Sequence, residues 1–524
     1  MKKLIAILLS ITFILASLSV AASAAGDVTP VIVVSGMNAY PLVDENEKTV
    51  FPMSIDVLLK DVPPIAGSAV ASLLGSNWKY LQKYGLDPIA DLFAGMACDE
   101  NGDSVKTLHT RTFPESLDNY RDHFETFTTN QEGTARAVAD KVGWENTYFM
   151  YYDWRISPMK LADELNTYVE KAKSEHGCSK VSLVPMSFGG TIVNAYLLKY
   201  GHDSIKNIVY ASTAFNGVEM VGKLFSGDPK ITLGDTMIYM AAFTQDIDLL
   251  TDVLSAVAAY ESKRDTVAEK YVDRTVQALI DELGDEVYQK IFGTTFAHMK
   301  GIWCLMPDEF YSGAKEYMKA HAEFSESFFD EIDEYMGFQS SLKSIIADLQ
   351  NDGVNVYITG SYGFSGIPVT SGADKRTDTL IETYLMTGDT TVAPYGKTLD
   401  DVEYTPTAEG YVSADNIIDA STGMLPDQTW FVKGIGHLKY QYGTRSMDLI
   451  TMLASSSERV TVTSDENFPQ FFAQDVKSGA SSSLTEGVSF SDTDSGKKWY
   501  DYILGFFRTL IDLAMRIFRF ERIS

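Results

Sequence analysis

Short apolar segments alternate along this chain with longer segments in which apolar residues recur at helical spacing. Helical spacing is present, for example, over residues 161–174 and 192–200. Strands that are buried on both faces consist of nearly continuous apolar residues. Six segments have this character: 30–35, 146–152, 180–184, 208–211, 354–359 and 429–433. Strands that alternate with helices predict an α/β protein with a doubly wound, mostly parallel sheet.

Two long segments interrupt this alternation. The first, residues 39–131, contains the apolar stretch 62–74. The second, residues 215–339, is acidic and carries apolar stripes at helical spacing, at 250–257 and 276–287. Such stripes are typical of helices that pack together, so this insertion is predicted to be a helical cap rather than a cofactor site. The predicted sheet domain then consists of residues 25–214, which include the first insertion, and residues 340–460.

The N-terminus has the pattern of a secretory signal. Lys2 and Lys3 precede an apolar run over residues 4–20, and the small residues 22–24 follow it. This order of charged, apolar and small-residue regions is typical of a cleaved signal peptide. We therefore predict that residues 1–24 are removed and that the protein is secreted. An uncleaved membrane anchor is the alternative, and the small-residue site disfavours it.

The composition is that of a globular protein with an acidic surface. Of the 524 residues, 45 % are hydrophobic and 22 % are charged, which is ordinary for a chain with a folded core. The formal net charge is −28, and loss of Lys2 and Lys3 with the signal would make it −30. A chain of this sign is not expected to bind the phosphates of nucleic acid.

Cysteine and histidine spacing predicts neither a disulfide scaffold nor a metal site. The three cysteines are scattered, so the sequence leaves open one disulfide bridge or none. Among these cysteines and the seven histidines, no pair has the spacing of metal ligands. No cofactor is predicted.

The C-terminal region is predicted to be an appendage. Residues 478–498 are rich in Ser, Gly and Thr, which is typical of a flexible linker. Residues 499–522 are predicted to form an amphipathic helix, whose charges fall in a stripe about 80° wide at about 100° per residue. The segment from Lys497 onward has six basic and three acidic residues, which favours peripheral contact with an anionic membrane. Docking of this helix on the protein body is the alternative.

Ser187 has the setting of a nucleophilic serine. It follows the apolar segment 180–184 after two residues, and a helical segment begins just beyond it. Gly189 and Gly190 supply the small neighbours that a sharp strand-to-helix turn requires. In the G-x-S-x-G pattern of such turns, Pro185 takes the place of the first glycine.

A nucleophilic serine needs a general base and an acid that orients it. In doubly wound hydrolases these follow in the order serine, acid, histidine. Of the later histidines, His202 ends a helical segment and His298 and His321 lie in the predicted cap. Only His437 directly follows a late strand, after two glycines, and is predicted to be the base.

Three aspartates compete for the role of the acid. Asp374 and Asp378 lie in the polar run 372–378, which has the composition of a solvated loop. Asp389 is flanked by apolar residues on both sides, as expected for a partly buried carboxylate. We therefore predict that Asp389 orients His437.

The oxyanion of an acyl-transfer intermediate requires two backbone N–H donors. One is expected from Phe188, the residue after the nucleophile. The other is expected from the loop 36–38 after the first strand, where Met37 is the best candidate.

Taken together, these segments resemble the lecithin:cholesterol acyltransferase family of α/β-hydrolases. The resemblance spans most of residues 28–450. It rests on the strand and glycine loop at 30–38, Tyr-Asp-Trp-Arg at 152–155, Gly-Asp-Thr-Thr-Val at 388–392 and the apolar segment ending in Pro at 301–307. It implies an α/β-hydrolase fold with a helical cap and a lipid or other ester substrate.

The chain also departs from the family pattern. The family surrounds its nucleophile with Gly-His-Ser-Met/Leu-Gly, whereas residues 185–189 are Pro-Met-Ser-Phe-Gly. Its oxyanion loop opens with Pro-Gly, whereas residues 35–36 are Ser-Gly. We therefore predict a secreted serine esterase or lipase, and do not extend the prediction to acyl transfer onto a sterol. A serine peptidase or amidase, and an inactive hydrolase fold used as a binding module, are the alternatives.

Overall fold

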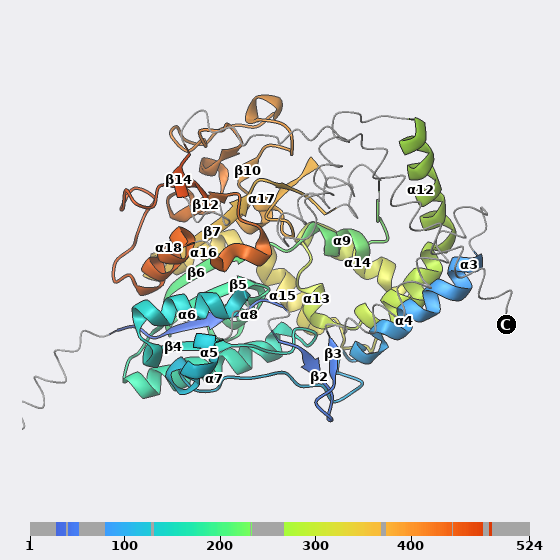
Figure 1. Ribbon diagram of the computed structural model, residues 1–524, viewed down its shortest axis with the longest axis horizontal. Helices are drawn as coiled ribbons and strands as arrows, with labels where there is room; N and C mark the ends of the chain where they lie inside the picture. The colour runs from blue at the N-terminus through green and yellow to red at the C-terminus, as the bar shows by residue number, and fades with distance from the viewer. Residues whose placement is uncertain are drawn as a thin grey trace, which may run out of the picture.

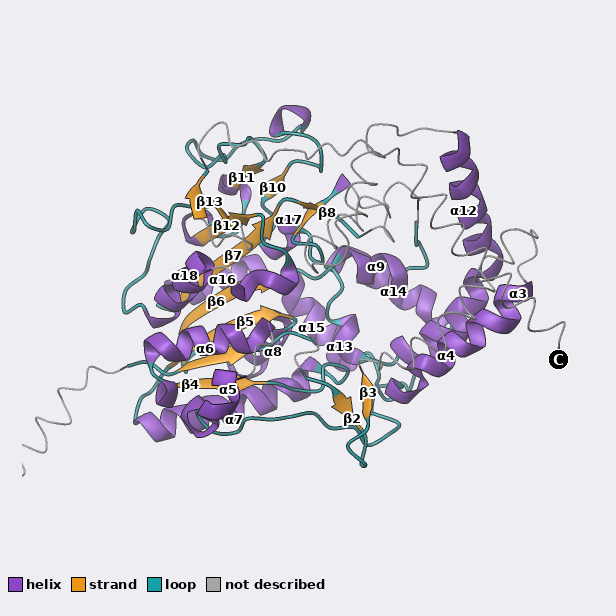
Figure 2. Ribbon diagram, viewed as in Figure 1, coloured by secondary structure: helices purple, strands orange, loops and turns teal. Residues whose placement is uncertain are grey.

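The computed structural model describes residues 28–37, 40–51, 79–126, 130–230, 232, 267–367, 374–442, 444–474 and 481–484. An eight-stranded sheet runs through it in the order β14-β13-β12-β7-β6-β5-β1-β4 (Figures 1 and 2). The strands are β1 (Val31–Val34), β4 (Thr147–Met150), β5 (Val181–Ser187), β6 (Ile205–Thr213), β7 (Asn355–Tyr362), β12 (Thr429–Lys433), β13 (Phe471–Gln474) and β14 (Ser481–Ser483). All neighbours are parallel except β13 and β14. The predicted α/β-hydrolase type of sheet is thus present, with all six predicted strands.

Helices cover both faces of this sheet, and side-chain alternation separates the two interfaces. Ile32 and Val34 of β1 contact one apolar cluster, and Val31 and Val33 contact the other. The first cluster includes α7 (Pro158–His176) and α8 (Gly189–Tyr200). The second includes α6 (Asn130–Val142) and α18 (Thr444–Ser455). Burial on both faces explains why the strands are mostly apolar.

The chain order places a switch point at β1. From β1 the chain first adds β4 on one side, and β5 then pairs with β1 on the other. In open α/β sheets, ligands bind beyond the carboxyl ends of the strands at such a point. The loops after β1 and β5 therefore meet where a site is expected.

The predicted cap region is helical in the part that the structure describes. It contains α9 (Glu219–Phe225), α12 (Val267–Val287), a π-helix (Tyr288–Phe296), α13 (Lys300–Trp303) and α14 (Asp308–Lys319). The next helices, α15 (Asp330–Ser340) and α16 (Leu342–Asn351), instead pack against α8 and β7 of the sheet domain. The layer of helices on the sheet thus begins before residue 340.

The first insertion contacts the cap, although the two are far apart in sequence (Figure 1). It contains the short strands β2 (Leu42–Val43) and β3 (Thr49–Phe51), then α3 (Lys79–Leu81), a π-helical turn (Gln82–Leu86), α4 (Asp87–Phe93) and, later, α5 (Arg121–Thr126). Phe93 of α4 packs on Phe296, with ring centroids 5.2 Å apart, and Lys290 pairs with Asp87 at 2.6 Å. The cap is therefore joined to the first insertion by apolar and ionic contacts.

Two strand boundaries differ from the sequence prediction. β5 continues through Pro185 to Ser187. Proline lacks a backbone N–H donor, but Pro185 still pairs with Val34 of β1, so the strand is not interrupted there. Residues 481–483, within the predicted linker, form β14 on the sheet edge. The predicted signal peptide, the apolar stretches 62–74 and 250–257, and the predicted C-terminal helix lie outside the described residues.

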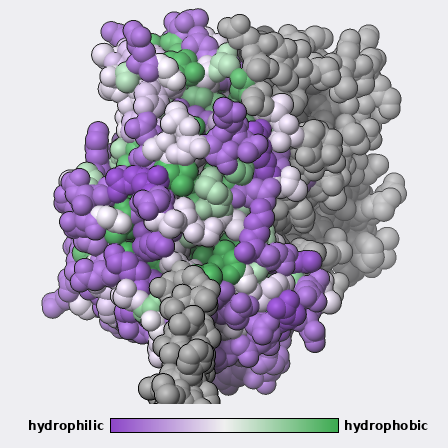
Figure 3. All heavy atoms as spheres, turned by 90° about the vertical axis from the view of Figure 1, so that its left-hand side faces the viewer, coloured by the Kyte–Doolittle hydropathy of each residue, from purple (hydrophilic) through white to green (hydrophobic). Residues whose placement is uncertain are grey.

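The described surface is in keeping with the acidic composition. On the face in Figure 3, most described residues are hydrophilic and apolar ones form scattered small patches. Among the helices that the structure describes, none is long and apolar enough to cross a membrane. Cys98, Cys178 and Cys304 are all free thiols, which settles the disulfide question left open by the sequence.

Candidate active site

Ser187 lies on a strained turn at the carboxyl end of β5. Its backbone φ is 49°, a left-handed value that non-glycine residues adopt at a cost. A side chain on Gly189 would place its Cβ 2.4 Å from the carbonyl oxygen of Val34, and one on Gly190 would meet Thr213 at 2.8 Å. The two glycines are therefore required by close approach to β1 and β6, and the turn that they allow leaves Ser187 partly exposed.

His437 contacts Ser187 from the loop after β12. Its Nε2 lies 2.9 Å from Ser187 Oγ, within hydrogen-bond distance. Its other ring nitrogen, Nδ1, lies 2.6 Å from Asp378 Oδ2. The backbone N–H of His437 also donates to the carbonyl of Asp378 at 2.6 Å, so two contacts fix the imidazole relative to this residue. The structure brings the predicted serine and histidine together.

The carboxylate that contacts His437 belongs to Asp378, which corrects the prediction of Asp389. Asp378 is fully buried, and its Oδ1 accepts hydrogen bonds from the N–H groups of Leu380 at 3.1 Å and Ile381 at 2.8 Å. Asp389 is exposed instead, and its Oδ1 accepts a hydrogen bond from Asn216 Nδ2 at 3.1 Å. One carboxylate is thus held toward the histidine by backbone donors, whereas the other binds a neighbouring loop.

The sequence argument failed because the polar residues before Asp378 do not form a solvated loop. Residues 376–377 form β9 (Arg376–Thr377), which pairs with β8 (Phe364–Ser365) and carries the next residue into the interior. Thr379 is also buried, with a left-handed φ of 88°. The sequence did contain a signal for Asp378. An aspartate followed closely by apolar residues such as Leu380 and Ile381 is typical of a turn in which the aspartate side chain accepts hydrogen bonds from the next backbone N–H groups.

The loop after β1 lies directly against Ser187. A Cβ on Gly36 would lie 2.6 Å from Ser187 Cβ and 3.1 Å from its Oγ, so only glycine fits there. Met37 follows at once and is partly buried. Phe188 opens α8 with its side chain buried against Tyr152, whose hydroxyl donates to the carbonyl of Ser35. The two residues predicted to supply oxyanion donors therefore flank Ser187 from two loops.

The Tyr-Asp-Trp-Arg string joins three parts of the molecule. The fully buried Arg155 contacts Asp153 through Nε at 3.0 Å and Nη2 at 2.6 Å. It also donates to the carbonyl of Met96 at 2.8 Å and to Ser104 Oγ at 2.9 Å, both in the first insertion. The N–H of Gly301, in the cap, donates to the Arg155 carbonyl at 3.2 Å. This string therefore holds the insertion and the cap to the sheet domain.

The apolar segment that ends in Pro307 packs beside the loop after β6. Val218 N–H donates to the Leu305 carbonyl at 2.7 Å, and a Cβ on Gly217 would lie 2.6 Å from the Pro307 nitrogen. Gln339 Nε2 bridges the carbonyls of Asn216 and Met306 at 3.1 and 3.0 Å. The segment thus anchors the start of the cap close to β6, the strand next to β5.

The other histidines considered from the sequence make different contacts. His298 bonds to the carbonyl of Glu323 at 2.7 Å, and His321 bonds to that of Tyr317 at 2.8 Å. His202 pairs with Asp352 on the surface. Within the described part of the chain, no group of three or more His, Cys, Asp or Glu side chains could hold a metal ion.

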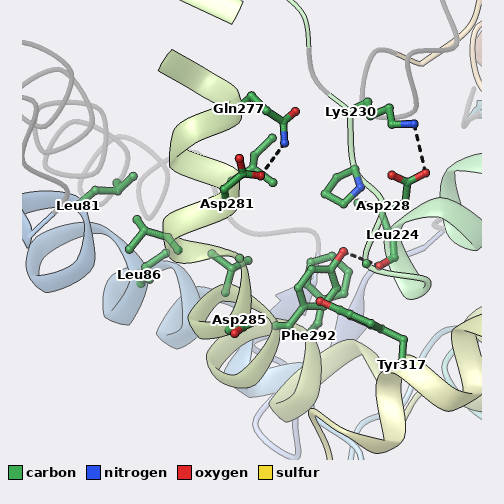
Figure 4. Close-up of a pocket in the computed structure, with 17 residues that line it drawn as sticks. Leu81, Leu86, Leu224, Asp228, Lys230, Gln277, Asp281, Asp285, Phe292 and Tyr317 are labelled. Atoms are coloured by element: carbon green, nitrogen blue, oxygen red, sulfur yellow. Dashed lines mark hydrogen bonds and ion pairs between the residues drawn. The ribbon is translucent and has the colours of Figure 1, made fainter. Parts of the chain in front are cut away.

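A separate cavity of about 630 Å³ lies between the first insertion and the cap. Figure 4 shows Leu81 and Leu86 on one side and Phe292 and Tyr317 on another. Gln277 bonds to Asp281, and Lys230 pairs with Asp228 at 3.5 Å, so polar groups at its edge are already partnered (Figure 4). Neither Ser187 nor any residue bonded to it lines this cavity, so the cavity and the serine site are distinct.

The parallel sheet, the strained serine turn after β5 and the histidine after a late strand together define an α/β-hydrolase fold. The family model described as Lecithin:cholesterol acyltransferase matches residues 139–323. This match confirms the predicted resemblance over the part of the chain that runs from α6 through the serine turn to the end of the cap helices.

Among solved structures, the chain is similar to one titled "The crystal structure of Tle4-Tli4 complex". The similarity covers 82 % of this chain and 97 % of that chain, with 12 % identity and a TM-score of 0.30. So remote a similarity does not indicate a substrate. No curated protein matches the chain.

Proposed function

We propose that this protein is a serine esterase or lipase that cleaves the acyl group from a lipid-like ester. The family match supports lipid ester hydrolysis or acyl transfer as the general class of reaction. The observation that carries the proposal is the hydrogen-bonded series from Ser187 Oγ through the His437 imidazole to the Asp378 carboxylate. A serine becomes a nucleophile when a base can take its proton and an anion stabilises the charged base.

The reaction begins with proton transfer from Ser187 to Nε2 of His437 as Oγ attacks the ester carbonyl carbon. Asp378 stabilises the imidazolium through Nδ1 and holds the ring in place. The N–H groups of Phe188 and Met37 are proposed to stabilise the oxyanion, and loss of one such donor costs about 3 kcal/mol in comparable sites. Collapse of the intermediate transfers the proton from His437 to the departing alcohol and leaves an acyl-serine. Water, activated by the same histidine, then releases the carboxylic acid.

Fluorophosphonate labelling tests the nucleophile. We expect a single labelled site in the wild-type protein and loss of labelling in Ser187→Ala. The control is Ser212→Ala, because Ser212 lies at the end of β6 and also has a left-handed φ, of 45°. Undiminished labelling of Ser187→Ala would overturn the assignment and favour an inactive hydrolase fold or another nucleophile.

A substrate series separates the esterase from a peptidase or amidase. We expect p-nitrophenyl esters to be cleaved with a preference set by acyl chain length, and peptide anilides to be cleaved far more slowly. Faster cleavage of the anilides would replace the esterase proposal by a peptidase on the same fold.

We also propose that the protein acts outside the cell and contacts anionic membranes through residues 499–522. The support is the signal-like sequence of residues 1–24 and the basic excess of the tail. A chain truncated after Ser495 should retain activity on a soluble ester and lose co-sedimentation with phosphatidylglycerol vesicles. Equal sedimentation of both forms would exclude the membrane contact, and a lower melting temperature after truncation would indicate a helix docked on the body.

A further inference from the structure

Two buried glutamates join the loop that carries Asp378 to the start of the cap. Glu219 is the first residue of α9, and Glu382 directly precedes α17 (Thr383–Met386). Glu219 is 6 % exposed and Glu382 is 1 % exposed. The backbone N–H of Glu219 donates to Glu382 Oε2 at 3.1 Å. Neither carboxyl contacts Ser187 or His437, so the proposed reaction does not use them.

The two glutamates differ in what surrounds their carboxyl groups. Glu219 Oε1 accepts a hydrogen bond from Tyr384 Oη at 2.7 Å and pairs with Lys375 Nζ at 3.3 Å. Lys375 and Tyr384 thus lie against the Glu219 carboxyl group. Glu382 is buried beside it, and burial together with the charge of Glu219 raises the pKa of Glu382 to about 8. Near neutral pH Glu382 therefore keeps its proton.

The position of Glu382 links this pair to the orientation of His437. Its backbone pairs with Thr377 of β9, the residue just before Asp378. The donors that hold the Asp378 carboxylate, Leu380 and Ile381, are the residues just before Glu382. Because Asp378 and Glu382 belong to one short, hydrogen-bonded segment, a displacement of Glu382 would also move Asp378.

On the other side, Glu219 belongs to the segment that leaves β6 beside the nucleophile. Ala214 N–H donates to the Ser187 carbonyl at 3.1 Å, and Asn216 N–H donates to the Leu385 carbonyl at 3.2 Å. The glutamate pair therefore lies between the loop that contacts the serine and the loop that carries the acid.

We propose that the Glu219–Glu382 pair is a proton-dependent latch that positions Asp378 for catalysis, and that ionisation of Glu382 releases it. With the proton on Glu382, Tyr384 and Lys375 contact the Glu219 carboxylate, and the backbone N–H of Glu219 donates to Glu382. When the proton is lost, two carboxylates are buried beside a single lysine, and a third carboxylate, Glu309 of α14, also acts on Tyr384. Repulsion between the two then favours separation of the loops.

The direction of the pH effect follows from linkage. Glu382 ionises at about 8 in the folded protein and at its ordinary value of 4.5 when unfolded, so the folded state holds the extra proton between these values. Stability therefore falls as the pH rises through this range, and the folded latch itself loses its proton at its upper end. From pH 8 to pH 9 the protonated fraction of Glu382 falls about fivefold, and above that it falls about tenfold for each pH unit.

This inference rests on the proposed esterase function, and its test has one readout that does not. We would measure kcat/KM for p-nitrophenyl butyrate and the melting temperature between pH 6 and 9.5. The variant is Glu382→Gln, which keeps the shape of the glutamic acid without its ionisation. The matched control is Glu316→Gln, which removes an exposed carboxylate of the cap.

We expect the wild-type protein to lose about fivefold in kcat/KM between pH 8 and 9, in proportion to the protonated fraction of Glu382. Glu382→Gln should be nearly level over this range and should match the wild type at pH 7, whereas Glu316→Gln should follow the wild type. The melting temperature should fall with rising pH in the wild type and much less in Glu382→Gln. Parallel pH profiles of the wild type and Glu382→Gln would overturn the latch.

A second variant reports on the latch if Glu382→Gln does not fold. The substitution Lys375→Gln removes a half-exposed cation that lowers the pKa of Glu382. The loss of kcat/KM at alkaline pH should therefore move to higher pH in this variant. An unchanged or lower midpoint would contradict the proposal. If no form hydrolyses esters while the melting temperatures still differ as described, the esterase function fails, and the proton-dependent link between the Glu219–Glu382 pair and the stability of the fold stands.

Discussion

Replacement of Asp378 by asparagine tests which carboxylate orients the histidine. The side chain is fully buried, and asparagine has nearly the same shape, so the protein should fold. The backbone N–H groups of Leu380 and Ile381 require an acceptor, and they will hold the amide oxygen where Oδ1 now lies. The amide NH₂ group of Asp378→Asn must then face Nδ1 of His437.

An NH₂ group in this position selects the wrong tautomer of the imidazole. Nδ1 has to accept its hydrogen bond, so the ring proton moves to Nε2, which lies 2.9 Å from Ser187 Oγ. The histidine can then no longer accept the serine proton. In triads of this type the same change lowers kcat about 10⁴-fold, or about 5 kcal/mol of transition-state stabilisation. We expect a loss of that order in Asp378→Asn.

Asp389→Asn is the matched comparison. Asp389 is exposed and contacts Asn216 rather than the histidine, so its replacement should change kcat/KM by less than about threefold, as for most surface substitutions. Both variants would be assayed on p-nitrophenyl butyrate and with a fluorophosphonate, and circular dichroism would confirm folding. A large loss in Asp389→Asn together with near-normal Asp378→Asn would refute the assignment and restore the acid predicted from the sequence.

Three further substitutions test other parts of the site. In an ester assay, His437→Ala should lower kcat at least about 10³-fold, since triad members act as a unit, and His298→Ala, in the cap, should retain most activity. Equal effects of the two substitutions would contradict the assignment of His437 as the proposed base. Gly36→Ala should lose activity because its Cβ would lie 2.6 Å from the side chain of Ser187; normal activity would show that the loop is displaced. Gly313→Ala in α14, where a Cβ meets nothing within 4 Å, should instead stabilise the helix by up to about 1 kcal/mol. Arg155→Ala should lower the free energy of unfolding by about 3–5 kcal/mol in urea titrations, because it breaks a buried ion pair and frees the first insertion; a change below about 1 kcal/mol would exclude the anchoring role.

The sequence by itself determined the parallel sheet and two members of the site. Strands buried on both faces must be apolar, so their residues could be recognised without knowledge of their neighbours. Ser187 could be recognised because a sharp strand-to-helix turn requires small residues beside it, and these residues are its neighbours in the sequence. His437 was found from its place after a late strand, since the carboxyl ends of parallel strands meet at one edge of the sheet.

Only the tertiary structure decided which aspartate contacts that histidine. Asp378 and Asp389 both follow β7, and local composition favoured the wrong one. Burial of Asp378 depends on the pairing of β8 with β9 and on backbone donors that face inward only after folding. The contacts of Arg155 with the first insertion and the cap, and the Glu219–Glu382 pair, likewise connect segments remote in sequence. Composition around a polar residue does not decide whether its hydrogen-bond partners will be water or buried backbone groups, because those partners are set when distant segments pack.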